Sequence, residues 1–412
     1  MKHSTGLGDL SRDELLAATY EYMLSGLIMV KTVTPLLILN AAITPEQMTA
    51  LSIQQWMGAS PIYTGRMRRL MGIEGDDVPA IMKALQLDVG FVHQYMDVRY
   101  LVQDATHGEF WLPHCGALLD VEPFGEEQVF NMCHTIEDPT FDATALATNP
   151  RARIRPLHRP PRIPVGRVPH CRWTLIIDEA NDPVGPIPRT DQVRLLALAT
   201  VANERVGDHS DGIDDYAGVF NPDFKLGSLS SAALLAVAHE FQVQTHLLVA
   251  SNELALDDMS SDPVLAQELQ EEGWLATSWI LAERLGRALR LGDGIEAVGN
   301  ALALTPMIPP GIDREISTEL NTLTCVFSST QEGLLDEAHP GWAGSLARGV
   351  TTGIEGTARG LGMEPTSVSV ETTSGMVTVQ MELHPAPPEA PEPDSVALSR
   401  IGLTADWTFE LV

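Results

Sequence analysis

The sequence has few cysteines and few basic residues for its length. Four cysteines in 412 residues are too few for a disulfide framework, so a reducing, cytoplasmic location is predicted. Lysine and arginine number 26 against 55 acidic residues, which gives a formal net charge of −29. Because nucleic-acid binding depends on clustered basic residues, this composition argues against a nucleic-acid partner, and none is predicted. The chain is long enough for two or three domains with full cores.

The sequence also lacks an uninterrupted apolar stretch and the common nucleotide or hydrolase motifs. The most apolar run, residues 24–42, contains Lys31 and Pro35. A membrane-spanning helix needs about 20 mainly apolar residues, so we expect a pair of buried helices here and no membrane partner. The start of the chain leads into Asp9 and Asp13, unlike a signal peptide. No glycine-rich phosphate loop and no GxSxG elbow is present.

Two halves of the chain share a pattern of residues. The segment 10–21 matches 229–240, and Trp56 then aligns with Trp274. Further blocks keep an offset of about 218 residues, which indicates an internal duplication, although leucine-alanine helices also produce such matches by coincidence. The cysteine-histidine pairs occur in the first half alone, so the second half is predicted to be a degenerate copy. Duplicated units commonly pack like a two-fold dimer.

The periodicity within each half predicts an α+β fold. Helical spacing over 11–30 and further helices near 46–58, 61–72 and 76–86 precede period-two segments. We therefore predict two tandem copies of a helix-bundle plus antiparallel-sheet unit, packed as a pseudo-dimer. The predicted divisions are 1–180 for the first copy, 181–222 for a linker with a helix and an acidic loop, 223–384 for the second copy, and 385–412 for a proline-rich linker and a terminal strand at 405–412.

The first copy is predicted to close with a hairpin, a helix and two more strands. The hairpin pairs 98–102 with 109–112, the helix covers 126–149 with a break before Pro139, and the strands are 151–157 and 172–177. The second copy repeats this with a strand at 316–324, a helix at 340–362 and a hairpin of 367–370 with 377–381.

Histidine and cysteine are concentrated in one stretch of the first copy. Three cysteines and six of the 12 histidines fall between positions 93 and 171: Cys115, Cys133, Cys171, His93, His107, His114, His134, His158 and His170. Imidazole nitrogen and thiolate sulfur are the ligands that zinc prefers, so the stretch predicts a site for zinc or another divalent transition metal.

Adjacent side chains of a strand point to opposite faces, so His170 and Cys171 are expected on opposite faces of their strand. Adjacent side chains of a helix point about 100° apart, so Cys133 and His134 are not both expected to bind one ion. His134 is therefore expected beside the metal and not on it, as a supporting residue or proton shuttle. One helical turn after Cys133, Glu137 is placed to act as a general base, or it is a solvated residue at a helix end. We expect a cavity between helix 126–149 and the N-terminal helices, with Trp111 and Tyr95 on its wall.

The segment 153–158 followed by 170–175 resembles the closing hairpin of the 4-vinyl-reductase-like small-molecule-binding domain and of the related L-2-amino-thiazoline-4-carboxylate hydrolase-like proteins. The resemblance implies a zinc held by Cys133, His158 and Cys171. The fourth ligand would come from Cys115, His114, His134 or His170. The hairpin loop 159–169 is longer than in that family, and His158 stands where cysteine is usual.

Two functions follow from these residues. One is a metal-dependent hydrolase or lyase that acts on a small organic molecule, with His134 and Glu137 as catalytic residues. The other is a small-molecule sensor or binding module in which the zinc is structural. The sequence is also compatible with a homo-oligomer.

Overall fold

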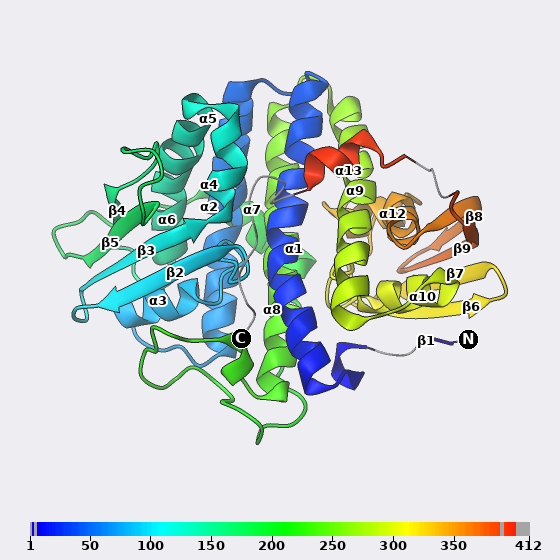
Figure 1. Cartoon of the computed structure of the whole chain (residues 1–412), viewed down its shortest axis with the longest axis horizontal. Helices are drawn as coiled ribbons and strands as arrows, with labels where there is room; N and C mark the ends of the chain where they lie inside the picture. The colour runs from blue at the N-terminus through cyan, green and yellow to red at the C-terminus, as the bar shows by residue number, and fades with distance from the viewer. Residues whose placement is uncertain (1, 4–5, 388–390, 401–412) are drawn as a thin grey trace.

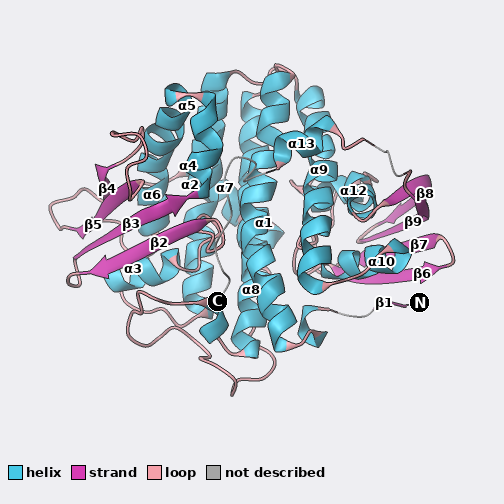
Figure 2. Ribbon diagram, in the orientation of Figure 1, coloured by secondary structure: helices cyan, strands magenta, loops and turns pink. Residues whose placement is uncertain are grey.

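The structure is a computed structural model that describes residues 2–3, 6–387 and 391–400. A central layer of long helices separates two antiparallel sheets that lie at opposite sides of the molecule (Figures 1 and 2). This arrangement confirms the predicted α+β class. The predicted strand at 405–412 lies outside the described residues.

The first half supplies the sheet shown on the left of Figure 1. Its strand order is β2-β3-β5-β4, and every neighbouring pair is antiparallel. The elements of this half are α1 (Arg12–Leu39), α2 (Pro45–Leu70), α3 (Val78–Leu85), β2 (Met96–Val102), β3 (His107–Cys115), α4 (Gly116–Val121), η2 (Glu122–Phe124), α5 (Glu126–Phe130), η3 (Asn131–Ile136), α6 (Glu137–Leu146), β4 (Ala152–His158) and β5 (Cys171–Ile177).

The second half repeats this order of elements. Its strands run β6-β7-β9-β8, which is the same order as in the first sheet, and the two-residue strand β1 (Lys2–His3) extends the β6 edge. The elements are α8 (Ser231–Met259), α9 (Pro263–Leu289), α10 (Gly294–Leu304), β6 (Asp313–Glu319), β7 (Thr322–Ser328), α11 (Trp342–Ala347), α12 (Thr352–Gly360), β8 (Met363–Thr373) and β9 (Met376–Pro385). Outside these two sets of elements, η1 (Leu7–Asp9) precedes α1, and the connecting segment contains α7 (Pro188–Arg194), η4 (Ala197–Thr200) and η5 (Leu226–Ser228), while α13 (Asp394–Ser399) is the last described element.

The long helices of the two halves pack against each other and not within their own half. Helix α1 packs against α8 and α9, and α2 packs against α8, whereas α1 and α2 touch each other little. Two equivalent ion pairs join these helices. Arg66 of α2 binds Glu240 of α8, with Nε 2.7 Å from Oε1, and Arg284 of α9 binds Glu21 of α1, with Nε 2.5 Å from Oε2. The α2–α8 ion pair thus corresponds to the α9–α1 ion pair.

Several predicted helix boundaries were wrong because proline does not interrupt the long helices. Pro35 lies inside α1 and Pro61 inside α2, so the expected helix pairs are single helices. An interior proline costs about 3 kcal/mol, and the extensive burial of both helices outweighs that cost. The predicted helix 126–149 is divided instead by η3, a π-helical turn at Asn131–Ile136. The widened turn precedes Pro139, which cannot donate a backbone hydrogen bond to the preceding turn.

Among the described helices, α1 is long and apolar enough to span a membrane by length and composition. In this structure 72% of its most apolar window is buried inside the protein. The core helix of a globular protein has the same character, so the length and hydropathy of α1 are weak evidence for a membrane span. The absence of a membrane partner stays a prediction.

Candidate functional site

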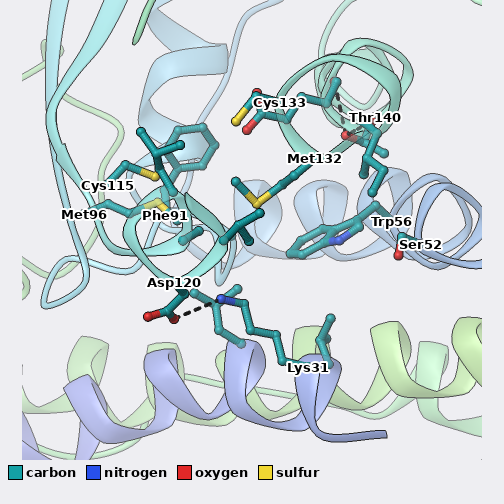
Figure 3. Close-up of a pocket in the computed structure, with 18 of the residues that line it drawn as sticks. Lys31, Ser52, Trp56, Phe91, Met96, Cys115, Asp120, Met132, Cys133 and Thr140 are labelled. Atoms are coloured by element: carbon teal, nitrogen blue, oxygen red, sulfur yellow. Dashed lines mark hydrogen bonds and ion pairs between the residues drawn. The ribbon is translucent and has the colours of Figure 1, made fainter. Parts of the chain in front are cut away.

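A cavity of about 560 Å³ lies in the first half, between α1, α2, the η3–α6 segment and the inner face of the first sheet. The predicted position of this cavity, between the 126–149 region and the N-terminal helices, is confirmed. Its wall is mainly apolar and aromatic, with Trp56, Phe91, Met96, Met132, Phe141 and Trp173 among the lining residues. Figure 3 shows Trp56, Phe91 and Met132 around this space.

The alternation of the strands decides which side chains face the cavity. Phe110 and Trp173 pair across β3 and β5 and stack with ring centroids 6.3 Å apart, on the buried face. Cys171 is two residues before Trp173, so it shares this inner face and lines the cavity. Trp111 and Arg172 form the next pair, on the outer face, where the guanidinium lies 5.4 Å from the centre of the indole ring. The prediction that Trp111 lines the cavity was therefore wrong.

One end of the cavity carries a buried lysine with two partners. Lys31 projects from α1, and its Nζ lies 2.9 Å from the hydroxyl oxygen of Tyr95 and 3.5 Å from Oδ2 of Asp120. Tyr95 donates a hydrogen bond to the same carboxylate. Figure 3 shows Lys31 and Asp120 paired at the opposite end from Cys133. Burial lowers the pKa of Lys31, and the nearby Asp120 opposes this shift. Tyr95 itself is buried but is not among the residues that line the cavity, so its predicted place on the wall was also wrong.

The other end of the cavity combines one carboxyl group with thiols. Glu137, at the start of α6, lines the cavity together with Cys115, Cys133 and Cys171. Burial raises the pKa of Glu137 to about 8, an effect that the Arg159 guanidinium reduces. Burial also raises the pKa of Cys115 to about 12, and it raises the pKa of Cys133 and of Cys171. The thiols are therefore protonated near neutral pH and contribute weakly polar surface.

A third carboxyl group lies on the α2 side. Asp88 lines the cavity, where its Oδ1 accepts hydrogen bonds from the backbone nitrogen of Gly90 at 2.7 Å and from the hydroxyl of Tyr63 at 3.2 Å. Burial raises the pKa of Asp88 to about 6. Unlike Asp88, Glu137 has no hydrogen bond or ion pair to its carboxyl group from any described residue.

The histidines that the sequence groups together are dispersed in space. His93 binds the carbonyl of Gln86, and His107 begins β3 beside Asp104 of the preceding turn. His134 stacks on Phe130, with centroids 4.1 Å apart, and its Nε2 lies 2.6 Å from the carbonyl oxygen of Pro160. It is not among the residues that line the cavity, so the geometry does not place it as a proton shuttle there.

Two other histidines differ from their expected positions. His158 pairs with Arg172 across β4 and β5 and therefore lies on the outer face of the sheet, away from Cys171. His170 precedes β5, so strand alternation does not apply to it, and it lines the cavity with Cys171. Its ring centroid is 5.9 Å from that of His114, and burial lowers the pKa of His170 to about 4.

This arrangement does not fit the zinc site that the resemblance implies. Within residues 6–387 and 391–400, no three histidine, cysteine, aspartate or glutamate side chains are grouped so that they could hold a metal ion. His158 is on the far side of the sheet from Cys171. Zinc stays a prediction of the sequence, which metal analysis of the purified protein can decide.

Exposed lining residues locate the mouth of the cavity. Phe124 in η2 is 76% exposed and Leu398 in α13 is 44% exposed, and both also line the cavity. Arg400, just after α13, binds Glu283 of α9 with Nη1–Oε2 at 2.8 Å and also binds Glu392. The ion pairs hold the last described turn of the chain beside the opening.

Sequence reasoning missed the polar residues of the helical wall. Lys31, Asp88 and Asp120 are single charges near apolar residues, and Lys31 interrupts the apolar run 24–42. A charged residue inside a buried helix is costly unless it is paired, so its presence in residues 24–42 was the available signal.

Comparisons with known proteins add no family to this description. A scan against protein-family models finds no match, and searches of the curated proteins and of the solved structures find none either. The resemblance to the 4-vinyl-reductase-like domain therefore stays a prediction.

Proposed function

We propose that this protein binds a small, mainly apolar organic molecule in the cavity of its first half. The observation that carries the proposal is the cavity itself, whose volume of about 560 Å³ falls within the range of ligand sites. Its wall is largely aromatic and aliphatic, and a few polar groups converge on it from α1, α4 and α6. Such sites bind through apolar burial, while the polar groups fix the orientation of the ligand.

We further infer that residues 1–180 and 223–384 are duplicated copies packed as a pseudo-dimer. The equal strand orders and the mirrored pairs Arg66–Glu240 and Glu21–Arg284 support this. The second copy would then act as the scaffold that completes the wall behind α1 and α2, because α8 and α9 pack against them.

Filling the cavity tests the binding function. Ser52 of α2 lines the cavity, so Ser52→Trp places an indole ring in the ligand space. We expect binding of the neutral fluorescent probe N-phenyl-1-naphthylamine to weaken by about tenfold or more, since overlap with the ligand space costs well above 1.4 kcal/mol. Fluorescence titration measures this change.

Ala50→Trp is the matched control, because Ala50 is exposed on the same helix and outside the lining residues. It should leave probe binding unchanged. Equal binding by both variants would show that the probe does not occupy the cavity, and it would remove the support for the proposed function.

A hydrolase or lyase acting on the bound molecule is the second candidate, and one observation favours it. A carboxyl group with its pKa raised to about 8 is poised as a general acid or base at neutral pH, and Glu137 is such a group on the cavity wall. In that case Glu137→Gln should reduce turnover of any substrate found by about 100-fold or more, while binding persists. Turnover that survives this change would exclude Glu137 as the catalytic group.

A further inference from the structure

Acidic side chains outnumber lysine and arginine side chains on the cavity wall. The acidic groups that line it are Asp88, Asp120 and Glu137, and the basic side chains that line it are Lys31 and Arg400. Arg400 is bound to Glu283 and Glu392 outside the cavity, and Lys31 is bound to Asp120. Within the described part of the chain, this leaves Asp88 and Glu137 without a cation on the wall.

The two remaining carboxyl groups differ in how well they are satisfied. Asp88 accepts hydrogen bonds from Gly90 and Tyr63. Glu137 receives no hydrogen bond on its carboxyl group from a described residue, and its neighbours on the wall are thiols and aromatic rings. Arg159 lies near Glu137, but its guanidinium is paired with Asp138 and lies 5.7 Å from the centre of the Trp173 ring. The Glu137 carboxyl group is half-buried and lines the cavity, so a donor group of a ligand in the cavity can reach it.

We propose that the ligand is an organic cation, an apolar body that carries a protonated amine, with its ammonium group placed against Glu137 and its apolar part against the aromatic wall. This inference rests on the proposed binding function and names the ligand class for the same cavity. A charge-assisted hydrogen bond to Glu137 would satisfy the carboxyl group. The rings of Trp56, Phe91, Phe141 and Trp173 suit both the apolar body and a nearby cation. Lys31 is held by Asp120 at the far end, so it does not repel the ammonium group at close range.

Three probes with one apolar body test the charge preference. They are 1-adamantylmethylamine, 1-adamantanemethanol and adamantane-1-carboxylate, which are positive, neutral and negative at pH 7. Isothermal titration calorimetry of the full chain should show the amine binding about tenfold or more tighter than the alcohol, and the carboxylate binding more weakly than both. This comparison needs only the wild-type protein.

Substitutions test whether the preference for the amine over the alcohol depends on Glu137. Glu137→Gln should reduce the advantage of the amine over the alcohol to about threefold or less while the alcohol still binds, because only the charge-assisted bond is lost. Glu127→Gln is the matched control, since Glu127 is exposed on the neighbouring helix α5, and it should keep the full advantage. Ser52→Trp should weaken the binding of all three probes by about tenfold or more, which distinguishes binding in the cavity from binding to the acidic surface.

Each result decides a separate question. If the alcohol binds and the amine has no advantage, or if the carboxylate binds best, the cation inference is wrong and the proposed binding function stands. If none of the three probes binds, the proposed function fails instead. If the amine still binds more tightly than the alcohol in the Ser52→Trp variant, the preference arises at the acidic surface of the protein. That result would overturn the inference.

Discussion

Arg66→Met is expected to lower the free energy of unfolding by about 3–5 kcal/mol, because it leaves the carboxylate of Glu240 buried without its counter-charge. The side chains of this pair are only 9% and 1% exposed, and two nitrogens of Arg66 bind the two carboxylate oxygens. Arg66 also donates to the carbonyl oxygens of Ala199 and Val201, which would lose these bonds as well. Urea unfolding of the wild type and the variant measures the difference.

The mirrored pair provides the control for this prediction. Arg284 and Glu21 make the same two-bond contact, but their side chains are 28% and 9% exposed. Solvent screens the more exposed pair, so Arg284→Met should cost less than Arg66→Met while acting in the same direction. A loss below about 1 kcal/mol for Arg66→Met would contradict the buried, inter-half role of the pair. The relative loss of unfolding free energy in the two variants tests whether both halves depend on the helices that pack against the opposite half.

The elements of this fold that could be predicted well from the sequence are those set by local alternation. Phe110 and Leu112 alternate with less buried neighbours in β3, and the predicted closing strands 151–157 and 172–177 correspond to β4 and β5. A period of two places such residues on one face of a sheet whatever the rest of the chain does. The helix spacing in both halves predicted the buried central layer for the same reason.

The errors arise where packing over long distances overrides a local rule. Pro35 and Pro61 remain inside the long helices α1 and α2, which are held by packing against helices of the other half. The π-helical turn that carries Cys133 has no sequence signal of its own beyond the proline that follows it. The strand register, and not the spacing in the sequence, sends His158 to the outer face and so separates it from Cys171. Clustering of histidines along the chain therefore did not predict clustering in space.

Glu137→Gln is expected to stabilise the protein increasingly as the pH rises from about 4.5 to about 8. The carboxyl group has an ordinary pKa of 4.5, and burial raises the pKa of Glu137 to about 8 in the folded state. Between these values the folded state binds more protons than the unfolded state, so this residue makes stability fall as pH rises. Glutamine does not titrate, so the variant escapes this loss. The difference should reach a few kcal/mol at pH 8 and above, since one pKa unit corresponds to about 1.4 kcal/mol.

Urea unfolding at pH 5, 6, 7 and 8 measures this difference, with Glu127→Gln as the matched control. Glu127 is exposed on α5, so its substitution should shift stability by the same small amount at every pH. Parallel pH profiles for Glu137→Gln and the wild type would mean that the carboxyl group is ionised and well solvated, or firmly paired, in the folded protein. Either state would remove the unsatisfied acceptor from the cavity wall, and with it the reason for placing a ligand cation or a general acid at this position. If the difference in unfolding free energy instead grows with pH, the folded protein does not provide enough hydrogen bonds or solvent to stabilise the ionised Glu137 carboxylate.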